Sequence, residues 1–509
     1  MSKWVLLFLL VCSTAQAQGL SARSVVDHAR ASNATLKAAM LQLESARWDL
    51  LGSESEYDPV LGLNASGQQN ATSNVFGGFG GSGGGSVRIN TIRRIDYGAS
   101  LSKHLIWGTD LTLTLSSYAQ WSRFSGGGLG LPSTGTGTNI GTGVGGTTPL
   151  FAFGNFGPVY NLTAKLALKQ PLWRGRGRDV GEANRRIARA TRTQTEHTRD
   201  RVGSELLRDV LTASWELWYA DATVSIQQQA REVATRQRDE ADARARSGSL
   251  APAEVLTFET QVATSDQDVL NASVERATRV HELERLVGDA GLSFDELSDE
   301  PPAGGGFSRK AVEEHAVSDS LEVREKVAAV QVARIQQKTA DDPKKPQLDL
   351  DSYVQTQGIG LDSYGDSARQ FVGGDVVSGF VGLTYSAPVN DRVRRAEAAK
   401  ARLATEIAEQ HLYEAKAQVL SEVRGALDRE AAGEQKVALA ERTVSIAERQ
   451  LAAEQSRYQS GSSTPIAVLE AQNAVRTAKL RLARARADWA ESALILDHLS
   501  GGLLARYVR

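Results

Sequence analysis

Two patterns of hydrophobic and polar residues alternate along the chain. In the first, apolar residues recur every three or four positions among Ala, Arg, Glu and Gln, as Leu206, Val210, Ala213 and Leu217 do. These stretches contain almost no Gly or Pro, so they predict long amphipathic helices. The stretch 179–246 would extend roughly 100 Å as one helix, which is too long for a compact globular domain. The predicted helices cover residues 22–56, 179–246, 252–286, 309–340, 391–459 and 465–499.

Strict alternation of apolar and polar residues marks the second pattern. Within 159–172, Leu162, Leu166 and Leu168 alternate with polar residues such as Lys165. One face of such a strand is apolar and the other polar, which is typical of a membrane β-strand with lipid outside and a wet lumen inside. A soluble antiparallel sheet with one wet face would alternate equally well. We expect four strands within 59–173 and two within 347–389.

The connections between the predicted strands differ in length. The turn at 107–110 is short, whereas 71–94 and 126–158 are long and rich in glycine. Membrane barrels have short turns on one side and long loops on the outer side. A formal G-x-G-x-x-G lies within 78–83, but no helix follows it, so a nucleotide-binding site is disfavoured.

The first residues have the composition of a secretory signal peptide. An apolar run over 4–12 is followed by a small-x-small cleavage site that ends at Ala17, so the mature chain would begin near Gln18. The run is too short to cross a bilayer, because a spanning helix needs about 20 apolar residues. A lipoprotein with Cys12 as the acylated residue is a weaker alternative, because Val11 stands where a small residue is expected.

Composition excludes several other classes of protein. Without Cys12 the mature chain has no cysteine, which excludes disulfides, thiol catalysis and cysteine-ligated metals. The seven histidines are dispersed, and neither an HExxH motif nor a G-x-S-x-G nucleophile elbow between a strand and a helix occurs, so we predict no enzyme, no catalytic residue, no metal site and no cofactor. The net charge of −2 lacks the excess of positive charge that is typical of proteins that bind nucleic acid. Because no later segment resembles a membrane-spanning helix, entry into a membrane would require a β-barrel.

An internal repeat is the most specific feature of the sequence. Residues 244–256 and 457–469 align without a gap and share Arg, Ser, Gly, Ser, Pro, Val and Leu at the same offsets. Each copy ends a helix at a glycine, Gly248 or Gly461, which adopts the left-handed cap conformation without a steric penalty. Each then restarts a helix with proline at its first position. The repeat therefore predicts two equivalent helical hairpin tips.

A second landmark recurs where each β region meets the long helix after it. Residues 170–175 (QPLWRG) match residues 387–392 (APVNDR) loosely, and in both cases a β segment closes and a long helix opens. Pro171, Gly175 and Pro388 are therefore the candidate residues of the junction between barrel and helix. Each half of the chain reads as helix, β region, long helix, tip and helix.

In this order the motifs resemble the TolC-like outer-membrane efflux protein family over essentially the whole mature chain. The residues that carry the resemblance are 32–36 (SNATL), 170–175 and the two R-x-x-S-G-S tips. It implies an α + β membrane protein, a trimeric transmembrane β-barrel continued by a long periplasmic α-helical barrel, with two internal structural repeats per protomer. It also implies docking onto a periplasmic adaptor (membrane fusion) protein and an inner-membrane transporter, in a tripartite efflux or type I secretion system that passes cargo to the cell exterior.

The strand count predicts an oligomer without reference to the family resemblance. Six strands are too few to close a barrel, which needs at least about eight, and open edges are not tolerated in lipid. Family members usually contribute four strands each, and six would give eighteen in a homotrimer. The expected organisation is signal peptide 1–17, first periplasmic helix 18–58, first barrel region 59–173, helical hairpin 174–290, linker 291–308, helix 309–346, second barrel region 347–389, second hairpin 390–500 and tail 501–509.

The resemblance also implies a gate at the tips. In the family, acidic side chains after the second tip line a closed entrance, and polar links hold it shut. Glu470 matches one such acidic position of the second tip, whereas Ala467 stands where a further acidic residue would be expected. In the first tip, the position equivalent to Ala467 is occupied by Glu254. Arg244 and Arg457 could bridge hairpins. The simpler alternatives are that Glu is favoured near any helix N-terminus and that arginines at helix ends are solvated.

The candidates for contact with the adaptor are Gly248, Gly461, Leu256 and Leu469, because exposed loop tips are where partners reach a rigid scaffold.

Two other kinds of protein are alternatives to an export duct. A structural or adhesive protein that spans the envelope has no need for two matched tips. A coiled-coil scaffold would show long uninterrupted heptads, whereas these helices are cut at glycines and separated by β segments.

Overall fold

The structure is a computed structural model that describes residues 21–507 except 77–85, 126–155, 249, 290–293, 295–299, 303, 305–307 and 362. The predicted signal peptide, residues 77–85 of the first glycine-rich loop, most of the second loop and part of the predicted linker lie outside the described residues. The chain divides into two compact units, a strand unit of Asp49–Ala188 and Arg334–Leu403 and a helical unit that comprises the remainder. In the described part of the chain, no helix combines the length and apolarity needed to cross a membrane.

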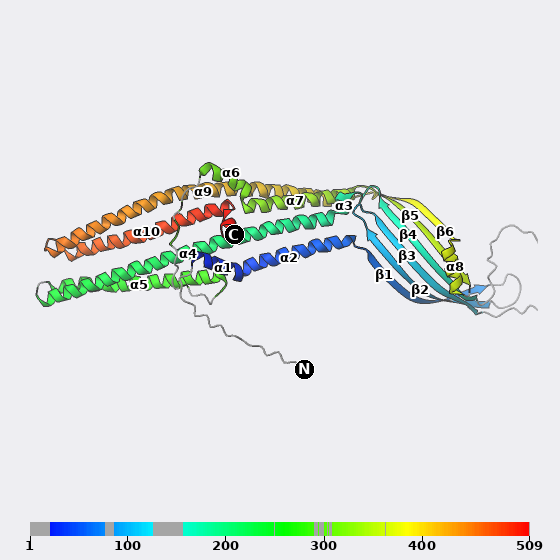
Figure 1. Ribbon diagram of the computed structural model, residues 1–509, viewed down its shortest axis with the longest axis horizontal. Helices are drawn as coiled ribbons and strands as arrows, with labels where there is room; N and C mark the ends of the chain where they lie inside the picture. The colour runs from blue at the N-terminus through cyan, green and yellow to red at the C-terminus, as the bar shows by residue number, and fades with distance from the viewer. Residues whose placement is uncertain are drawn as a thin grey trace, which may run out of the picture. The chain divides into compact units, whose positions relative to one another are not determined.

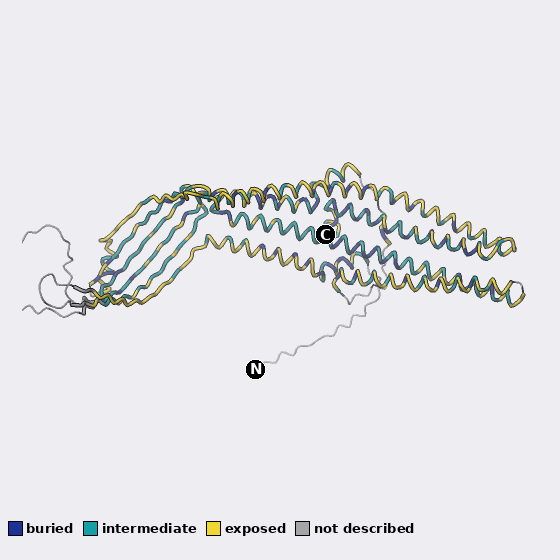
Figure 2. The backbone as a smooth tube through the Cα atoms, turned by 180° about the vertical axis from the view of Figure 1, so that it is seen from behind, coloured by how far each residue is buried: buried dark blue, intermediate teal, exposed yellow. Residues whose placement is uncertain are grey.

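The strand unit holds one antiparallel sheet in which every strand pairs with its neighbour in sequence, in the order β1 to β6 (Figure 1). Four strands precede the first long hairpin and two follow it, as the alternation predicted. β1 and β6 are the edges of the sheet, and their residues are exposed almost throughout (Figure 2). The strands are β1 (Val60–Phe76), β2 (Ser86–His104), β3 (Asp110–Ser125), β4 (Phe156–Pro171), β5 (Gln347–Leu361) and β6 (Val377–Ser386).

The register of the sheet separates an apolar face from a polar one. Across β2, β3, β4 and β5, Leu101 lies opposite Leu113, Leu113 opposite Leu166 and Leu166 opposite Val354. All four side chains are 45–58% exposed. The neighbouring row on the other face is polar, and includes Lys165. A broad, exposed apolar face on a sheet is the arrangement of membrane strands, so the soluble-sheet alternative is disfavoured.

One helix inside the second β region was not predicted. α8 (Tyr364–Gly373) lies across the apolar face, where the ring of Tyr364 meets that of Tyr160 edge to face at 5.9 Å. Gly358 on β5 makes room for it, because a Cβ there would lie 1.9 Å from the carbonyl oxygen of Ser367. The two strands expected within 347–389 are present as β5 and β6, and α8 is an additional element between them.

The long predicted helices form, but three of them are interrupted. The predicted helices 22–56, 179–246 and 309–340 are broken at Asn33, Glu182 and Ser320, respectively. The Asn33 side chain donates to the carbonyl of Leu286 (2.7 Å) and accepts from the amide of Leu36 (3.0 Å), so it caps the helix that follows. The helices are α1 (Ala22–Ser32), α2 (Ala34–Glu54), α3 (Arg178–Gly181), α4 (Ala183–Arg246), α5 (Pro252–Val287), α6 (Arg309–Asp319), α7 (Leu321–Asp341), α9 (Arg392–Gln459), α10 (Pro465–Leu499) and α11 (Gly502–Tyr507), with short 3₁₀ turns at Ser55–Tyr57 and Asp342–Lys344.

The core of the helical unit is the predicted apolar stripe of α4. Leu206, Val210, Ala213 and Leu217 are all 7% exposed or less, and they pack with buried residues of α1, α5 and α10. Burying such side chains stabilises the unit by roughly 1.5–3 kcal/mol each for Leu and Val. The stripe explains why helices this long hold together side by side rather than as isolated rods.

Candidate functional site

The second tip joins α9 to α10 through a tight cap. Gly461 has φ +78°, and its amide donates to the carbonyl of Tyr458 (3.0 Å). The amide of Ser462 donates to the carbonyl of Arg457 (2.8 Å), which completes a Schellman motif. The next helix begins at Pro465, and Thr464 caps it. The glycine is required here, because a residue with a Cβ is strained at that φ.

The first tip, between α4 and α5, uses the same construction. Gly248 has φ +80°, its amide donates to the carbonyl of Ala245 (3.0 Å), and α5 begins at Pro252. The repeat seen in the sequence therefore corresponds to a repeated turn. Both glycines are exposed, as is Leu256, whose side chain is 61% accessible.

Two contacts join the tip regions of the hairpins α4/α5 and α9/α10. The guanidinium of Arg244 lies 5.3 Å from the centre of the Tyr458 ring, a cation–π contact. Leu469 of α10 is only 8% exposed and packs with Phe258 of α5 and Ala241 of α4. Leu469 therefore serves packing between hairpins, and its burial leaves it unavailable to an adaptor in this conformation.

The other predicted arginine does not bridge the hairpins in this protomer. Arg457 pairs with Glu454 one turn earlier on α9 (2.7 Å). Glu454 also accepts from the hydroxyl of Ser463 (2.9 Å), so it ties α9 to the loop beyond the tip. Glu454 was missed by the sequence reasoning, although its spacing of three from Arg457 on a helix was a usable signal.

The predicted acidic residues stand exposed near the tips. Glu254 lies in the first turn of α5, and Glu470 lies one turn further into α10. Glu470 borders an open hollow of about 520 Å³ between α9 and α10, together with Gln450 and Asn473. Among the described residues, neither carboxylate forms an ion pair. Both are therefore free to interact with ions or with another chain.

A polar link further along the helices joins the two hairpins. Arg476 on α10 donates to Asp268 on α5 and, at 3.3 Å, to Gln227 on α4. Arg484 on α10 makes a similar bridge to Glu216 on α4 at 2.7 Å. These links lie outside the tip motifs, and their members are more than 200 residues apart in sequence, so no local pattern pointed to them.

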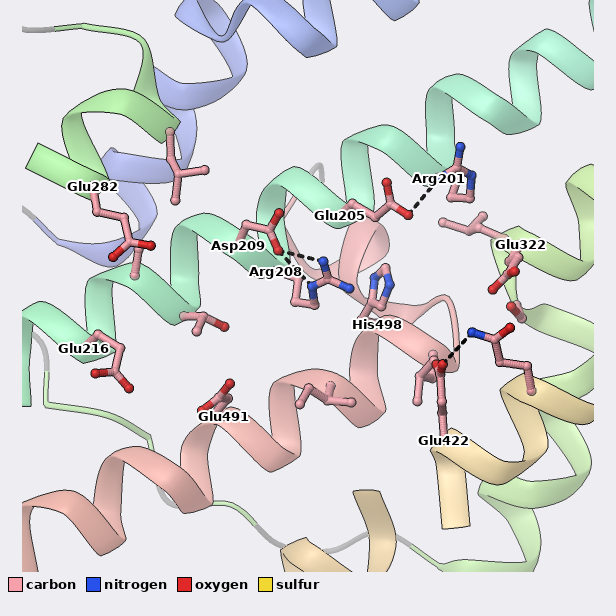
Figure 3. A pocket seen from close by; sticks show the side chains of 18 of the residues that line it. Arg201, Glu205, Arg208, Asp209, Glu216, Glu282, Glu322, Glu422, Glu491 and His498 are labelled. Carbon is pink, nitrogen blue, oxygen red and sulfur yellow. Dashed lines mark hydrogen bonds and ion pairs between the residues drawn. The ribbon is translucent and has the colours of Figure 1, made fainter. Parts of the chain in front are cut away.

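A charged cavity of about 1070 Å³ lies in the helical unit where α10 ends and α7 begins (Figure 3). Arg201 of α4 reaches across it to Glu325 of α7 (2.6 Å). Burial, followed by the positive charge of Arg208, lowers the pKa of His498 to about 4, and the ring is within 2.8 Å of the Ser204 hydroxyl. The labelled side chains around the cavity come from α4, α5, α7, α9 and α10, and include Glu205, Asp209, Glu216, Glu282, Glu322, Glu422 and Glu491.

The predicted junction residues lie within the strand unit. Pro171 is buried at the end of β4, whereas Pro388 is exposed after β6. Gly175 has φ +83°, and its amide donates to the carboxylate of Asp342 (2.7 Å). Asp342 is 3% exposed and also pairs with Lys345 (2.8 Å). Through its bond to Gly175, Asp342 connects the turn after β4 with the segment before β5. The sequence reasoning missed this role.

Comparison with known proteins agrees with this architecture. The family model for "Outer membrane efflux protein" matches residues 107–289 and 314–502, once in each half of the chain. No match was found among the curated proteins.

Solved structures of outer-membrane channels share the fold. VceC of Vibrio cholerae superposes with a TM-score of 0.63 at 15% identity, over 94% of this chain and 96% of that one. CmeC of Campylobacter jejuni gives a TM-score of 0.62 at 13% identity, over 97% and 90%. The open state of MtrE of Neisseria gonorrhoeae gives a TM-score of 0.60 at 16% identity, over 95% of this chain and 89% of that one.

Members of this family are not enzymes, and TolC-family proteins form trimers. The two matches cover both helical hairpins, strands β3 and β4 of the first β region, and the whole second β region. The chain therefore belongs to the outer membrane efflux protein (TolC) family and is an outer-membrane efflux channel of a tripartite export system that extends into the periplasm.

Proposed function

We propose that three copies of this chain close a single barrel and a single helical tube, which passively conduct cargo to the cell exterior. The observation that carries the proposal is the pair of exposed edges, β1 and β6, on a sheet whose outer face is apolar. In lipid, every backbone amide and carbonyl must find a partner, so β6 of one copy must pair with β1 of the next. Three copies of six strands make eighteen.

The strand number determines the width of the proposed pore. With strands about 4.8 Å apart and tilted by about 40°, eighteen strands enclose a barrel roughly 36 Å across between backbones. Barrels of this size leave an aqueous channel rather than a side-chain core. The polar face of the sheet, with Lys165 and Gln355, would line that channel.

Pairing of the two edges can be tested with engineered disulfides. A cysteine replacing Leu63 on β1 is combined in turn with single cysteines along β6, and oxidation should link protomers into dimers and trimers on a denaturing gel. A matched control places the first cysteine at Leu113 on the central strand β3, which no neighbouring protomer reaches. Cross-links from Leu113 as readily as from Leu63 would contradict the shared barrel.

We further propose that the hairpin tips form a closed entrance for cargo. Three copies of Glu470, with Glu254 nearby, would form acidic rings around the trimer axis, and rings of carboxylates favour cations. The contact of Arg244 with Tyr458 and the link of Arg476 to Asp268 hold the two hairpins of each protomer together. Opening of the entrance would separate the hairpins and break both contacts.

The tips are also the proposed docking site for a periplasmic adaptor protein and, beyond it, an inner-membrane transporter. Gly248, Gly461 and Leu256 are exposed there and support this assignment. In cells, Leu256→Glu should reduce export, while the purified variant should keep its conductance. Leu270→Glu is the control, because Leu270 is an equally exposed apolar residue (63%) further along α5. Equal loss of export in both variants would argue against docking at the tip.

A further inference from the structure

Two arginines stand on the apolar face of the sheet, near the strand ends remote from the helices. Arg93 on β2 lies opposite Trp121 on β3, and Arg123 lies opposite Thr91. The two arginines are therefore diagonal neighbours on one face, about 7–8 Å apart at the backbone. Both side chains are exposed.

The arginines border a hollow of about 700 Å³ together with Gln69, Thr91 and Trp121. Gly67 also borders the hollow, and a Cβ there would meet no atom within 4 Å. The hollow thus combines guanidinium, amide and hydroxyl donors with one aromatic ring.

The donors of these arginines are largely uncommitted. Arg93 uses its Nε to donate to Gln69 (2.9 Å), which holds the side chain in place and leaves the two terminal nitrogens. Among the described residues, no carboxylate pairs with Arg93 or Arg123. By contrast, Arg94 on the opposite face pairs with Asp96 at 2.7 Å. Charged groups that face lipid are costly, so on a lipid-facing surface this pair of unneutralised guanidinium groups favours an anionic partner from outside the chain.

The position of the hollow along the strand matches a bilayer surface. On β2 the next cation on this face is Lys103, ten residues away, and Ile95, Tyr97, Ala99 and Leu101 lie between them. Ten residues advance about 33 Å along a strand, or about 25 Å along the membrane normal at a tilt of about 40°. This equals the height of the apolar band of an outer-membrane barrel.

Helix α8 marks the same level independently. It packs on this face beside Tyr160, which lies in the same row as Ala119 and Ile95, next to Arg93. The exposed side of α8 includes Asp366 and Arg369, which form an ion pair at 3.5 Å. A charged pair on the outer side of a helix is expected where lipid headgroups begin.

The hollow lies on the outer side of the membrane. The helices attach to the opposite strand ends, through Tyr57 before β1 and Pro171 at the end of β4, and the channels of this family extend into the periplasm. Arg93 and Arg123 are therefore directed to the outer leaflet. This step rests on the proposed barrel, in which the apolar face contacts lipid.

We propose that this hollow binds the phosphate groups of a phosphorylated glycolipid of the outer leaflet. The planar fork of arginine matches phosphate oxygens with two parallel hydrogen bonds, and two adjacent arginines match a dianionic group. Trp121 offers a flat apolar surface to the sugar, while Gln69 and Thr91 can bind its hydroxyls. The acyl chains lie along the apolar band below.

The test uses the purified full-length trimer and native mass spectrometry with bisphosphorylated lipid A as the probe. Arg93→Gln combined with Arg123→Gln should weaken retention of the lipid at least about tenfold, since two charge-assisted contacts are lost. Lys103→Gln, which removes an exposed cation from the same face at its periplasmic end, should leave retention unchanged. Dephosphorylated lipid A should bind the wild type as weakly as the double variant.

Several outcomes would overturn the proposal. Equal retention of lipid A by wild type and double variant, or binding that does not depend on the lipid phosphates, contradicts it. Displacement of lipid A by millimolar inorganic phosphate would indicate a site for the free ion instead. Trimer content and bilayer conductance are measured on the same samples, so failure of the barrel is recognised separately. If the double variant does not assemble, the dephosphorylated lipid tests the site on the wild type.

Discussion

The link between Arg476 and Asp268 gives the most direct prediction about the proposed closed entrance. Arg476 lies on the second hairpin, whereas Asp268 and Gln227 lie on the first, so this side chain joins the two. The two charged side chains are 22% and 30% exposed, which limits screening by water. Hydrogen bonds to charged groups of this kind contribute about 1.5–3 kcal/mol. Loss of the link should shift the equilibrium between joined and separated hairpins by roughly 10- to 150-fold.

Single-channel recording in planar bilayers measures this shift as a rise in open probability. Arg476→Ala and Asp268→Ala should each raise it, and the double variant should add little, because either substitution already breaks the link. Lys479→Ala is the matched control. Lys479 lies one turn further along α10 and pairs with Glu448 of its own hairpin at 3.1 Å, so its loss should leave the hairpins joined.

Two results would refute this reasoning. If Arg476→Ala and Lys479→Ala gave the same open probability as the wild type, the link would not restrain the entrance. If the effects of Arg476→Ala and Asp268→Ala were simply additive, the two residues would not act through each other.

Three further predictions follow from buried or crowded positions. Asp342→Ala leaves the amide of Gly175 unpaired and should lower the heat stability of the trimer by about 2–4 kcal/mol, measured by thermal dissociation in detergent. Because the pKa of His498 in the folded protein is lowered to about 4, protonation opposes folding, so stability is full above pH 6.5 and falls by up to about 3 kcal/mol as pH drops toward 4. In thermal scans at pH 6.5 and pH 4, the His498→Gln variant should lack the loss of stability that protonation of His498 causes. An unchanged loss in the variant would exclude His498 as the source of the pH dependence. Gly358→Val should displace α8 from Ser367 onward, seen as amide exchange in α8 faster by at least about tenfold, and unchanged exchange would contradict the close packing.

The long elements could be predicted because each follows a single periodicity over many residues. The predicted helix 465–499 forms as α10 (Pro465–Leu499), and both hairpin turns follow from a glycine and a proline at fixed spacing. Strand alternation gave six strands for the same reason. These features are local, so the sequence contains everything needed to recognise them.

The features that were missed depend on partners distant in sequence. Asn33 breaks a helix because its side chain reaches Leu286, and nothing near it in the chain signals that bond. Leu469 stands at a tip like Leu256, yet it is buried because its side of α10 faces the other hairpin. α8 forms on glycines of β5, where local composition favoured a loop or strand.

The most direct test of the central claim is the conductance of the purified trimer in planar bilayers, with wild type and Glu470→Ala compared over a range of divalent cation concentrations. A passive duct with an acidic entrance predicts a cation-selective conductance that divalent cations reduce, and a loss of both properties in the variant. A trimer that inserts but does not conduct would contradict the duct itself, whereas conductance indifferent to the substitution would remove Glu470 from the entrance.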